Sequence, residues 1–129
     1  MVDADHIRAV YARYPAMVSK GDVDGVVALY AEDATIEDPI GSEPRRGRDA
    51  IREFYTASAG SVTIRCTGPV RVAGCEAATP MVVLLGPDGP DQRALDVISH
   101  MRFDDDGRIA SMRAFWSFDA MRPATDADR

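Results

Sequence analysis

The 129-residue chain has no apolar run of the roughly 20 residues that a membrane-spanning helix needs. Residues 1–5 also lack the basic and apolar regions of a secretory signal, so we expect a cytoplasmic protein with no membrane partner. Histidine and cysteine are scarce, with two of each. Because His6, His100, Cys66 and Cys75 do not have the spacing of metal ligands, we predict no metal, no cofactor and two reduced thiols.

Positive charge is in short supply, since 15 Lys and Arg against 21 Asp and Glu give a net charge of −6. Such a chain repels nucleic acids and anionic membranes unless a local basic patch intervenes. The one dense basic cluster, at 45–48, is short and follows Glu43, so we interpret it as a solvated loop and expect no nucleic-acid partner. Hydrophobic residues, by contrast, make up 46% of the chain, enough for one domain with a core and a ligand cavity.

Helical spacing occupies the first half of the chain and strand patterns the second. Helices before hairpins predict an α+β domain over residues 1–122, with a mostly antiparallel sheet covered by helices on one face. The polar tail at 123–129 is predicted to be disordered. The first predicted helix runs from a cap at Asp5 to Gly21, and Pro15 either kinks it or means that this boundary is wrong. The others run from a cap at Asp22 to about Ala31 and from Arg48 or Asp49 to Ala59. Predicted strands lie at 62–67, 70–73, 77–85, 93–103 and 109–118, with hairpin turns at 87–90 and 104–107.

The run Met81-Val82-Val83-Leu84-Leu85 is apolar at every position. A strand of this kind is expected to be buried on both faces. Because the helices can cover only one face of the sheet, we predict that a second copy of the chain covers the other, which makes the protein a homodimer.

Another predicted strand ends in Glu37-Asp38-Pro39. Because strand side chains alternate, Asp38 shares a face with Ala34 and Ile36. A carboxylate at the end of an apolar row is costly unless it is paired or held at a pocket mouth, where it can act as a general base. The alternative is that Asp38 is a solvated turn residue before Pro39.

Four more polar groups point toward the predicted core. Ser99 is the only polar side chain in an apolar row of its strand, and Tyr14, Tyr30 and Tyr55 lie on the inward stripes of their segments. Each alone can be a core residue whose hydrogen bonds are satisfied by the protein. Together with Asp38 they favour one apolar pocket with a base and neutral donors, which suits removal of a proton next to a carbonyl.

Segments spread in order over residues 12–117 match a known pattern. They are Ala12-Arg13-Tyr14, residues 17–22, Leu29 to Pro39, Phe54-Tyr55, residues 67–71, 94–98 and 101–104, and Trp116-Ser117. In these segments the chain resembles the bacterial Δ5-3-ketosteroid isomerase family of the nuclear transport factor 2-like (SnoaL-like) superfamily. The resemblance implies a cone-shaped fold in which a curved sheet wraps around three N-terminal helices. It also implies a steroid-sized cavity at the open end and a homodimer across the sheet.

The resemblance further implies a mechanism. Asp38 would remove a proton from C4 of a 3-oxo-Δ5-steroid and return it at C6, through a dienolate that carries negative charge on the 3-oxygen. Tyr14 would donate a hydrogen bond to this oxygen, supported by Tyr30 and Tyr55. Substrate-lining residues are expected at Phe54, Met81, Val97, Met112 and Trp116.

The chain departs from the family at Ser99, where the family has an aspartic acid. Asp96 cannot replace it, because three residues along a strand place it on the opposite face. A serine hydroxyl can donate to an oxyanion and needs no raised pKa to keep its proton, although it is a weaker acid. We therefore expect an active isomerase whose oxyanion hole consists of Tyr14 and Ser99.

Two other hypotheses stay open. One is a SnoaL-like cyclase or dehydratase that uses the same pocket, although a dehydratase is expected to place a histidine with the aspartate. The other is a non-catalytic binder of a steroid or another hydrophobic ligand, in which Ser99 marks lost catalysis. Strand position alone is also compatible with Met112 and Trp116 packing in the core.

Overall fold

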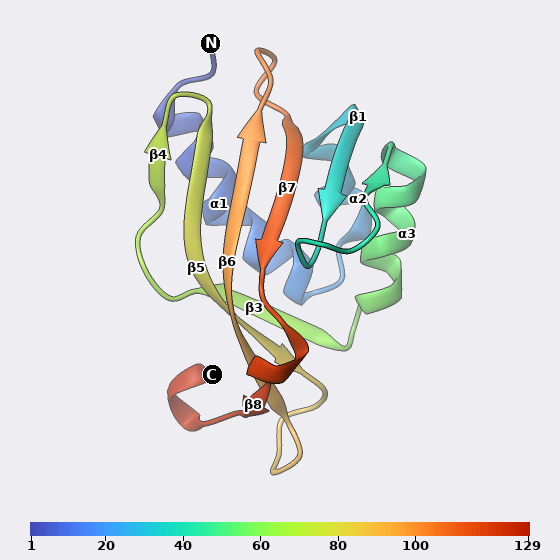
Figure 1. Ribbon diagram of the computed structural model, residues 1–129, viewed down its shortest axis with the longest axis vertical. Helices are drawn as coiled ribbons and strands as arrows, with labels where there is room; N and C mark the ends of the chain where they lie inside the picture. Colours follow the sequence, from blue (N-terminus) through green and yellow to red (C-terminus); the bar gives the residue numbers. More distant parts are fainter.

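Three helices lie on one side of a single sheet in the computed structural model, which describes residues 1–129 (Figure 1). They are α1 (Ala4–Ser19), α2 (Val23–Ala28) and α3 (Arg48–Ser58). Asp3, and not Asp5, caps α1, because its carboxylate accepts a hydrogen bond from the backbone N–H of His6 at 2.8 Å. Pro15 lies inside α1. Helix α2 ends earlier than predicted because Tyr30 already begins the first strand.

The sheet has eight strands: β1 (Tyr30–Glu37), β2 (Arg45–Arg46), β3 (Val62–Cys66), β4 (Arg71–Ala73), β5 (Glu76–Leu85), β6 (Arg93–Phe103), β7 (Ile109–Phe115) and β8 (Arg122–Pro123). Their order is β2-β1-β7-β6-β5-β3, with β4 beside β5 and β8 beside β6. Only β1 and β7 pair in parallel. The hairpins β5–β6 and β6–β7 turn where predicted. The predicted α+β class with a mostly antiparallel sheet is confirmed.

The basic cluster at 45–48 was predicted to be a solvated loop, but most of it belongs to a strand and a helix. Arg45 and Arg46 form the edge strand β2 beside Thr35 and Ile36 of β1. Arg48 begins α3 and donates hydrogen bonds of 2.8 and 3.2 Å to the carbonyl oxygen of Tyr30. The cluster therefore fixes the start of α3 against β1, which a composition argument did not show.

Strand alternation gives the sheet an inner face toward the helices. On β6 the buried row consists of Leu95, Val97, Ser99, Met101 and Phe103, as the period of two predicted. Burying a large apolar side chain stabilises the fold by about 1.5–3 kcal/mol, and a shift of one residue would expose the whole row. This register holds Ser99 on the inner face.

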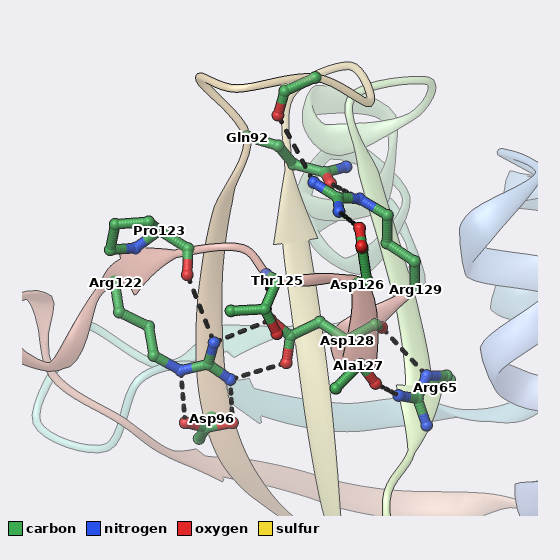
Figure 2. Close-up of polar contacts among 11 residues, drawn as sticks. Arg65, Gln92, Asp96, Arg122, Pro123, Thr125, Asp126, Ala127, Asp128 and Arg129 are labelled. Atoms are coloured by element: carbon green, nitrogen blue, oxygen red, sulfur yellow. Dashed lines mark hydrogen bonds and ion pairs between the residues drawn. The ribbon is translucent and has the colours of Figure 1, made fainter.

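The C-terminal segment is the main difference from the predicted fold. Residues 123–129 were expected to be disordered, but Pro123 belongs to β8 and residues 126–128 form a short 3-10 helix (Figure 2). The guanidinium of Arg122 donates to both carboxylate oxygens of Asp96 at 2.9 and 3.0 Å and to both of Asp128 at 2.8 and 2.9 Å. These bonds hold the pKa of each carboxyl below its usual range.

A second cation ties the end of this segment to the far edge of the sheet. Arg65 on β3 donates to the carbonyl oxygens of Asp128 at 3.0 Å and Ala127 at 2.5 Å (Figure 2). Sequence composition missed this order because the partners of the polar tail lie on distant strands. Arg65 therefore connects the C-terminal segment to β3.

The C-terminal segment also covers part of the sheet face that was predicted to bind a second copy of the chain. Val82, Leu84 and Ala94 form a small buried cluster on the outer face of the sheet, and Ala124 packs against it. The chain thus covers the outer side of its own apolar run, so that run does not call for a second copy. No helix in the structure combines the length and apolar character needed to cross a membrane.

Candidate active site

An apolar cavity of about 240 Å³ lies between the inner face of the sheet and helices α1 and α3. Its volume is somewhat below the ~300–1,000 Å³ range that is typical of small-molecule sites. Most of its walls are hydrophobic, and Asp38 is the only carboxylate on them. The predicted site residues that line it are Tyr14, Asp38, Phe54, Tyr55, Met81, Val97, Ser99, Met112 and Trp116. Of the predicted set, only Tyr30 lies behind the wall.

Asp38 follows β1 and is held against the end of β7. The backbone N–H of Ile40 donates to the carbonyl oxygen of Ala114 at 2.9 Å, and the indole N–H of Trp116 donates to Oδ1 of Asp38 at 2.5 Å. Burial raises the pKa of the Asp38 carboxyl, and the bond from Trp116 partly opposes this shift. Asp38 is therefore a cavity carboxylate with a raised pKa, and the solvated-turn alternative is not what the structure shows.

Three tyrosines from three different elements form a chain of phenols beside the cavity. The Tyr55 hydroxyl lies 2.7 Å from that of Tyr14 and 2.6 Å from that of Tyr30. All three are buried, and burial raises the pKa of each phenol. The phenols therefore stay protonated at neutral pH and can act as hydrogen-bond donors.

The available donors and acceptors set the direction of the hydrogen bonds among the three phenols. Tyr30 is fully buried and the shortest contact of its hydroxyl is with that of Tyr55, so we assign the proton of Tyr30 to this bond. Tyr55 then donates to Tyr14. The proton of Tyr14 is left free to point into the cavity that this residue lines.

Ser99 lines the same cavity and is almost fully buried. Its hydroxyl oxygen lies 3.4 Å from the hydroxyl of Tyr11, a residue that the sequence analysis did not assign to the site. Tyr11 lies one turn before Tyr14 on the buried stripe of α1. That shared stripe was the signal from which Tyr11 could have been found.

Three other features were missed. Trp116 was expected only as a lining residue, yet it also binds Asp38. Phe118 and Met121 line the cavity, and the Phe118 ring packs edge-on against that of Trp116 at 4.9 Å between centroids. These residues were overlooked because the last strand was predicted to run to 118, whereas β7 ends at Phe115 and the chain turns there.

A larger hollow of about 470 Å³ lies between β3, the loop after β5 and the C-terminal segment. Most of the residues that line it are polar, and two of them, Arg129 and Asp88, form an ion pair at 2.8 Å. Neither Asp38 nor Ser99 reaches it. The candidate active site is therefore the smaller, apolar cavity.

A sheet wrapped against three helices, with one carboxylate and several hydroxyl donors on an apolar cavity, defines a small-molecule domain built for proton transfer. Comparison with known families gives a match over residues 11–112 to the family described as SnoaL-like domain. This chain belongs to the SnoaL-like domain family, and the resemblance drawn from the sequence is confirmed.

Two relatives and one solved structure narrow the comparison. A Steroid Delta-isomerase of Nocardioides simplex is 43% identical over 111 residues, which is 86% of this chain and 89% of that protein. Epoxide hydrolase LasB of Streptomyces lasalocidi is 32% identical over 131 residues, 95% of this chain but 46% of that protein. The solved structure is of SalBIII, described as epoxide hydrolase/cyclase-like, with a TM-score of 0.86 and 29% identity over 96% of this chain and all of that one.

Proposed function

We propose that this protein is a steroid Δ-isomerase, which moves the C5–C6 double bond of 3-oxo-Δ5-steroids into conjugation with the ketone. The observation that carries the proposal is the single carboxylate, Asp38, on an apolar cavity that also holds the Tyr14 and Ser99 hydroxyls. The 43% identity to the Nocardioides simplex isomerase supports it. The reaction is an intramolecular proton transfer, so it requires no cofactor or co-substrate.

Asp38 acts as the base. Its carboxylate takes a proton from C4, the C4–H electron pair forms the C3–C4 double bond of a dienolate, and the 3-oxygen becomes negative. The same proton then returns to C6, and the conjugated 3-oxo-Δ4-steroid forms. A raised pKa matches this role, because a carboxylate in apolar surroundings is a stronger base than one in water. The bond from Trp116 fixes its orientation.

Tyr14 and Ser99 stabilise the dienolate oxygen. Tyr14 donates its free proton, and the bonds from Tyr55 and Tyr30 behind it polarise that donor. Ser99 supplies the second donor in place of the family's aspartic acid. Preorganised donors in a water-poor site are worth more than the same groups in water, because they need no reorganisation as charge develops. We propose that Phe54, Met81, Val97, Met112 and Trp116 hold the apolar body of the steroid.

The test is the initial rate of conversion of 5-androstene-3,17-dione to its conjugated isomer, followed by ultraviolet absorbance. We expect turnover that saturates with substrate and needs no added metal or cofactor. Binding of the steroid, seen as a shift in Tm, without any conjugated product would favour the hypothesis of a non-catalytic binder.

A second candidate function is an epoxide hydrolase or cyclase, because LasB and SalBIII are described in those terms. Opening an epoxide requires an acid to protonate the leaving oxygen and a base to activate the attacking hydroxyl. The cavity offers Asp38 as a base, and its other protic groups are the Trp116 indole and hydroxyls such as Tyr14, whose pKa is raised by burial. The isomerisation needs only the one carboxylate that the cavity holds, whereas opening an epoxide needs a separate acid beside it. Turnover of an epoxide with no turnover of the steroid would decide for this alternative.

Ser99→Ala is expected to lower kcat on the steroid by about tenfold. Removing one oxyanion donor costs roughly 100- to 1,000-fold when the donor is strong, and a serine hydroxyl is a weaker donor than most. KM should change less than kcat, because the bond strengthens as the negative charge forms. Steady-state kinetics measure both constants, and an unchanged kcat would remove Ser99 from the oxyanion hole.

We also propose a homodimer through the outer face of the sheet. Ile98 of β6 and Phe115 of β7 are register partners on that face, and they are 43% and 49% exposed. Pro80 of β5 is the other neighbour of Ile98, so the three side chains form an apolar patch suited to contact with a second copy. Light scattering is expected to give twice the chain mass of 14.0 kDa. Ile98→Asp should shift the protein toward the monomer, and a wild-type monomer at micromolar concentration would contradict the proposal.

A cytoplasmic location is part of the same proposal. Cys66 and Cys75 are both free thiols in the structure. Unpaired cysteines fit a reducing compartment, where thiols are kept reduced.

A further inference from the structure

Tyr11 is a buried phenol that neither the proposed mechanism nor the sequence analysis uses. Its side chain is 1% exposed, and it does not line the cavity. The Ser99 hydroxyl, at 3.4 Å, is the one polar group with which the Tyr11 hydroxyl forms a contact. This separation is longer than most O–H···O bonds, as catalytic hydrogen bonds often are before a ligand binds.

The available acceptors determine which hydroxyl donates. The Ser99 oxygen is the one hydrogen-bond partner of the Tyr11 hydroxyl, and a buried O–H that is left without an acceptor destabilises the fold. Ser99, by contrast, faces the cavity, where a ligand oxygen can accept its proton. Tyr11 is therefore the donor and Ser99 the acceptor, which turns the serine proton toward the cavity.

The hydroxyl of Thr79, the polar residue beside Ser99, does not compete with Tyr11 for the Ser99 oxygen. Thr79 lies opposite Ser99 in the register of β5 and β6 and is also buried. Its hydroxyl donates to the carbonyl oxygen of Gly68 at 3.4 Å. The Thr79 proton is thus engaged elsewhere, and the Ser99 oxygen remains available to Tyr11.

We propose that Tyr11 is a positioning residue that orients and polarises the Ser99 hydroxyl toward the ligand oxygen. The inference rests on the proposed function, because it gives Ser99 the same role in binding the dienolate oxygen. A serine hydroxyl is a weak acid, and a phenol that donates to its oxygen makes its own proton a better donor. The cavity then has two oxyanion donors, each supported by a phenol: Tyr14 by Tyr55, and Ser99 by Tyr11.

A double-mutant cycle tests this role with Tyr11→Phe, Ser99→Ala and the double variant. Tyr11→Phe in the wild-type background should lower kcat about 3- to 10-fold, the value of one net hydrogen bond, with a smaller change in KM. In the Ser99→Ala background the same change should have almost no effect, because the hydroxyl that Tyr11 polarises is gone. Equal losses in both backgrounds, or no loss in either, would overturn the proposal.

Binding of 2-naphthol, whose oxyanion imitates the charged oxygen of the dienolate, gives a second readout that does not depend on turnover. Its affinity should fall 3- to 10-fold with Tyr11→Phe and stay unchanged when Ser99 is already Ala. Coupling in naphthol binding without steroid turnover in the wild type would keep the Tyr11–Ser99 pair and reject the isomerase. Steroid turnover with additive effects would keep the isomerase and reject the pair.

A second variant that preserves the packing tests the same role if the Tyr11→Phe protein does not fold. Site-specific Tyr11→3-fluorotyrosine keeps the ring and hydroxyl but makes the phenol a stronger acid. The stronger donor should raise naphthol affinity in the wild-type background and leave it unchanged in the Ser99→Ala background. A purely structural role of Tyr11 predicts no such difference, so equal affinity in the first comparison would overturn the proposal.

Discussion

Asp38→Asn is expected to lower steroid turnover by roughly 100- to 10,000-fold, the usual contribution of a general base. The amide of the introduced asparagine has nearly the shape of the carboxyl and can still accept the hydrogen bond from Trp116. KM should therefore change little while kcat collapses. The measurement is the initial rate of enone formation over a range of substrate concentrations. A kcat within tenfold of the wild type would show that another group removes the proton.

The same substitution should make the protein more stable at neutral pH. Burial raises the pKa of Asp38, so the folded protein binds this proton more tightly than the unfolded chain does. The stabilisation from the protonated form is complete below the unfolded pKa and is lost as the pH rises through the folded pKa. At pH 7 the charged carboxylate thus costs stability, which an uncharged amide avoids. We expect a gain of about 0.5–2 kcal/mol at pH 7, measured by urea unfolding, and little gain near pH 3.

Glu37→Gln is the matched control, because Glu37 precedes Asp38 and points to the other face. Its carboxylate accepts hydrogen bonds from the Gly41 backbone N–H at 3.1 Å and from Arg113 at 3.0 Å, which lower its pKa. The sign is therefore reversed: this group stabilises the fold above its unfolded pKa and stops doing so as the pH falls through the folded pKa. Glu37→Gln should lower stability at pH 7 and leave turnover unchanged. A rise in stability would contradict the assignment of opposite environments.

Periodicity was sufficient to place the polar groups of the site. The period of two in strands placed Asp38 and Ser99 on inward rows, and the inward stripes of α1 and α3 placed Tyr14 and Tyr55. These predictions concern one element at a time. They need only the knowledge of which side faces the core.

The contacts between elements could not be derived in this way. Trp116 reaches Asp38 because β1 and β7 lie side by side in parallel, a pairing across most of the chain that no local pattern contains. Arg122 donates to Asp96 for a similar reason, because β8 pairs with β6. The contact of Tyr11 with Ser99 was missed as well, since a buried stripe shows which side chains turn inward and not which ones meet.

Tyr14→Phe is expected to lower kcat by roughly 100- to 1,000-fold, the loss that follows removal of one strong oxyanion donor. The substitution also removes the acceptor of the Tyr55 hydroxyl, so the free energy of unfolding should fall by about 1–3 kcal/mol. KM should change less than kcat, because the bond from Tyr14 strengthens only as charge forms on the 3-oxygen. Steady-state kinetics and urea unfolding of the same preparation separate the two effects.

Tyr30→Phe provides the comparison that makes this prediction specific. It deletes a phenol of the same chain that does not line the cavity and acts only through Tyr55. Its effect on kcat should be about tenfold or less, because the Tyr14 proton still reaches the ligand and only its polarisation is weakened. Equal losses for Tyr14→Phe and Tyr30→Phe would mean that the phenols support the fold of the cavity together, and that Tyr14 does not donate directly to the reacting oxygen.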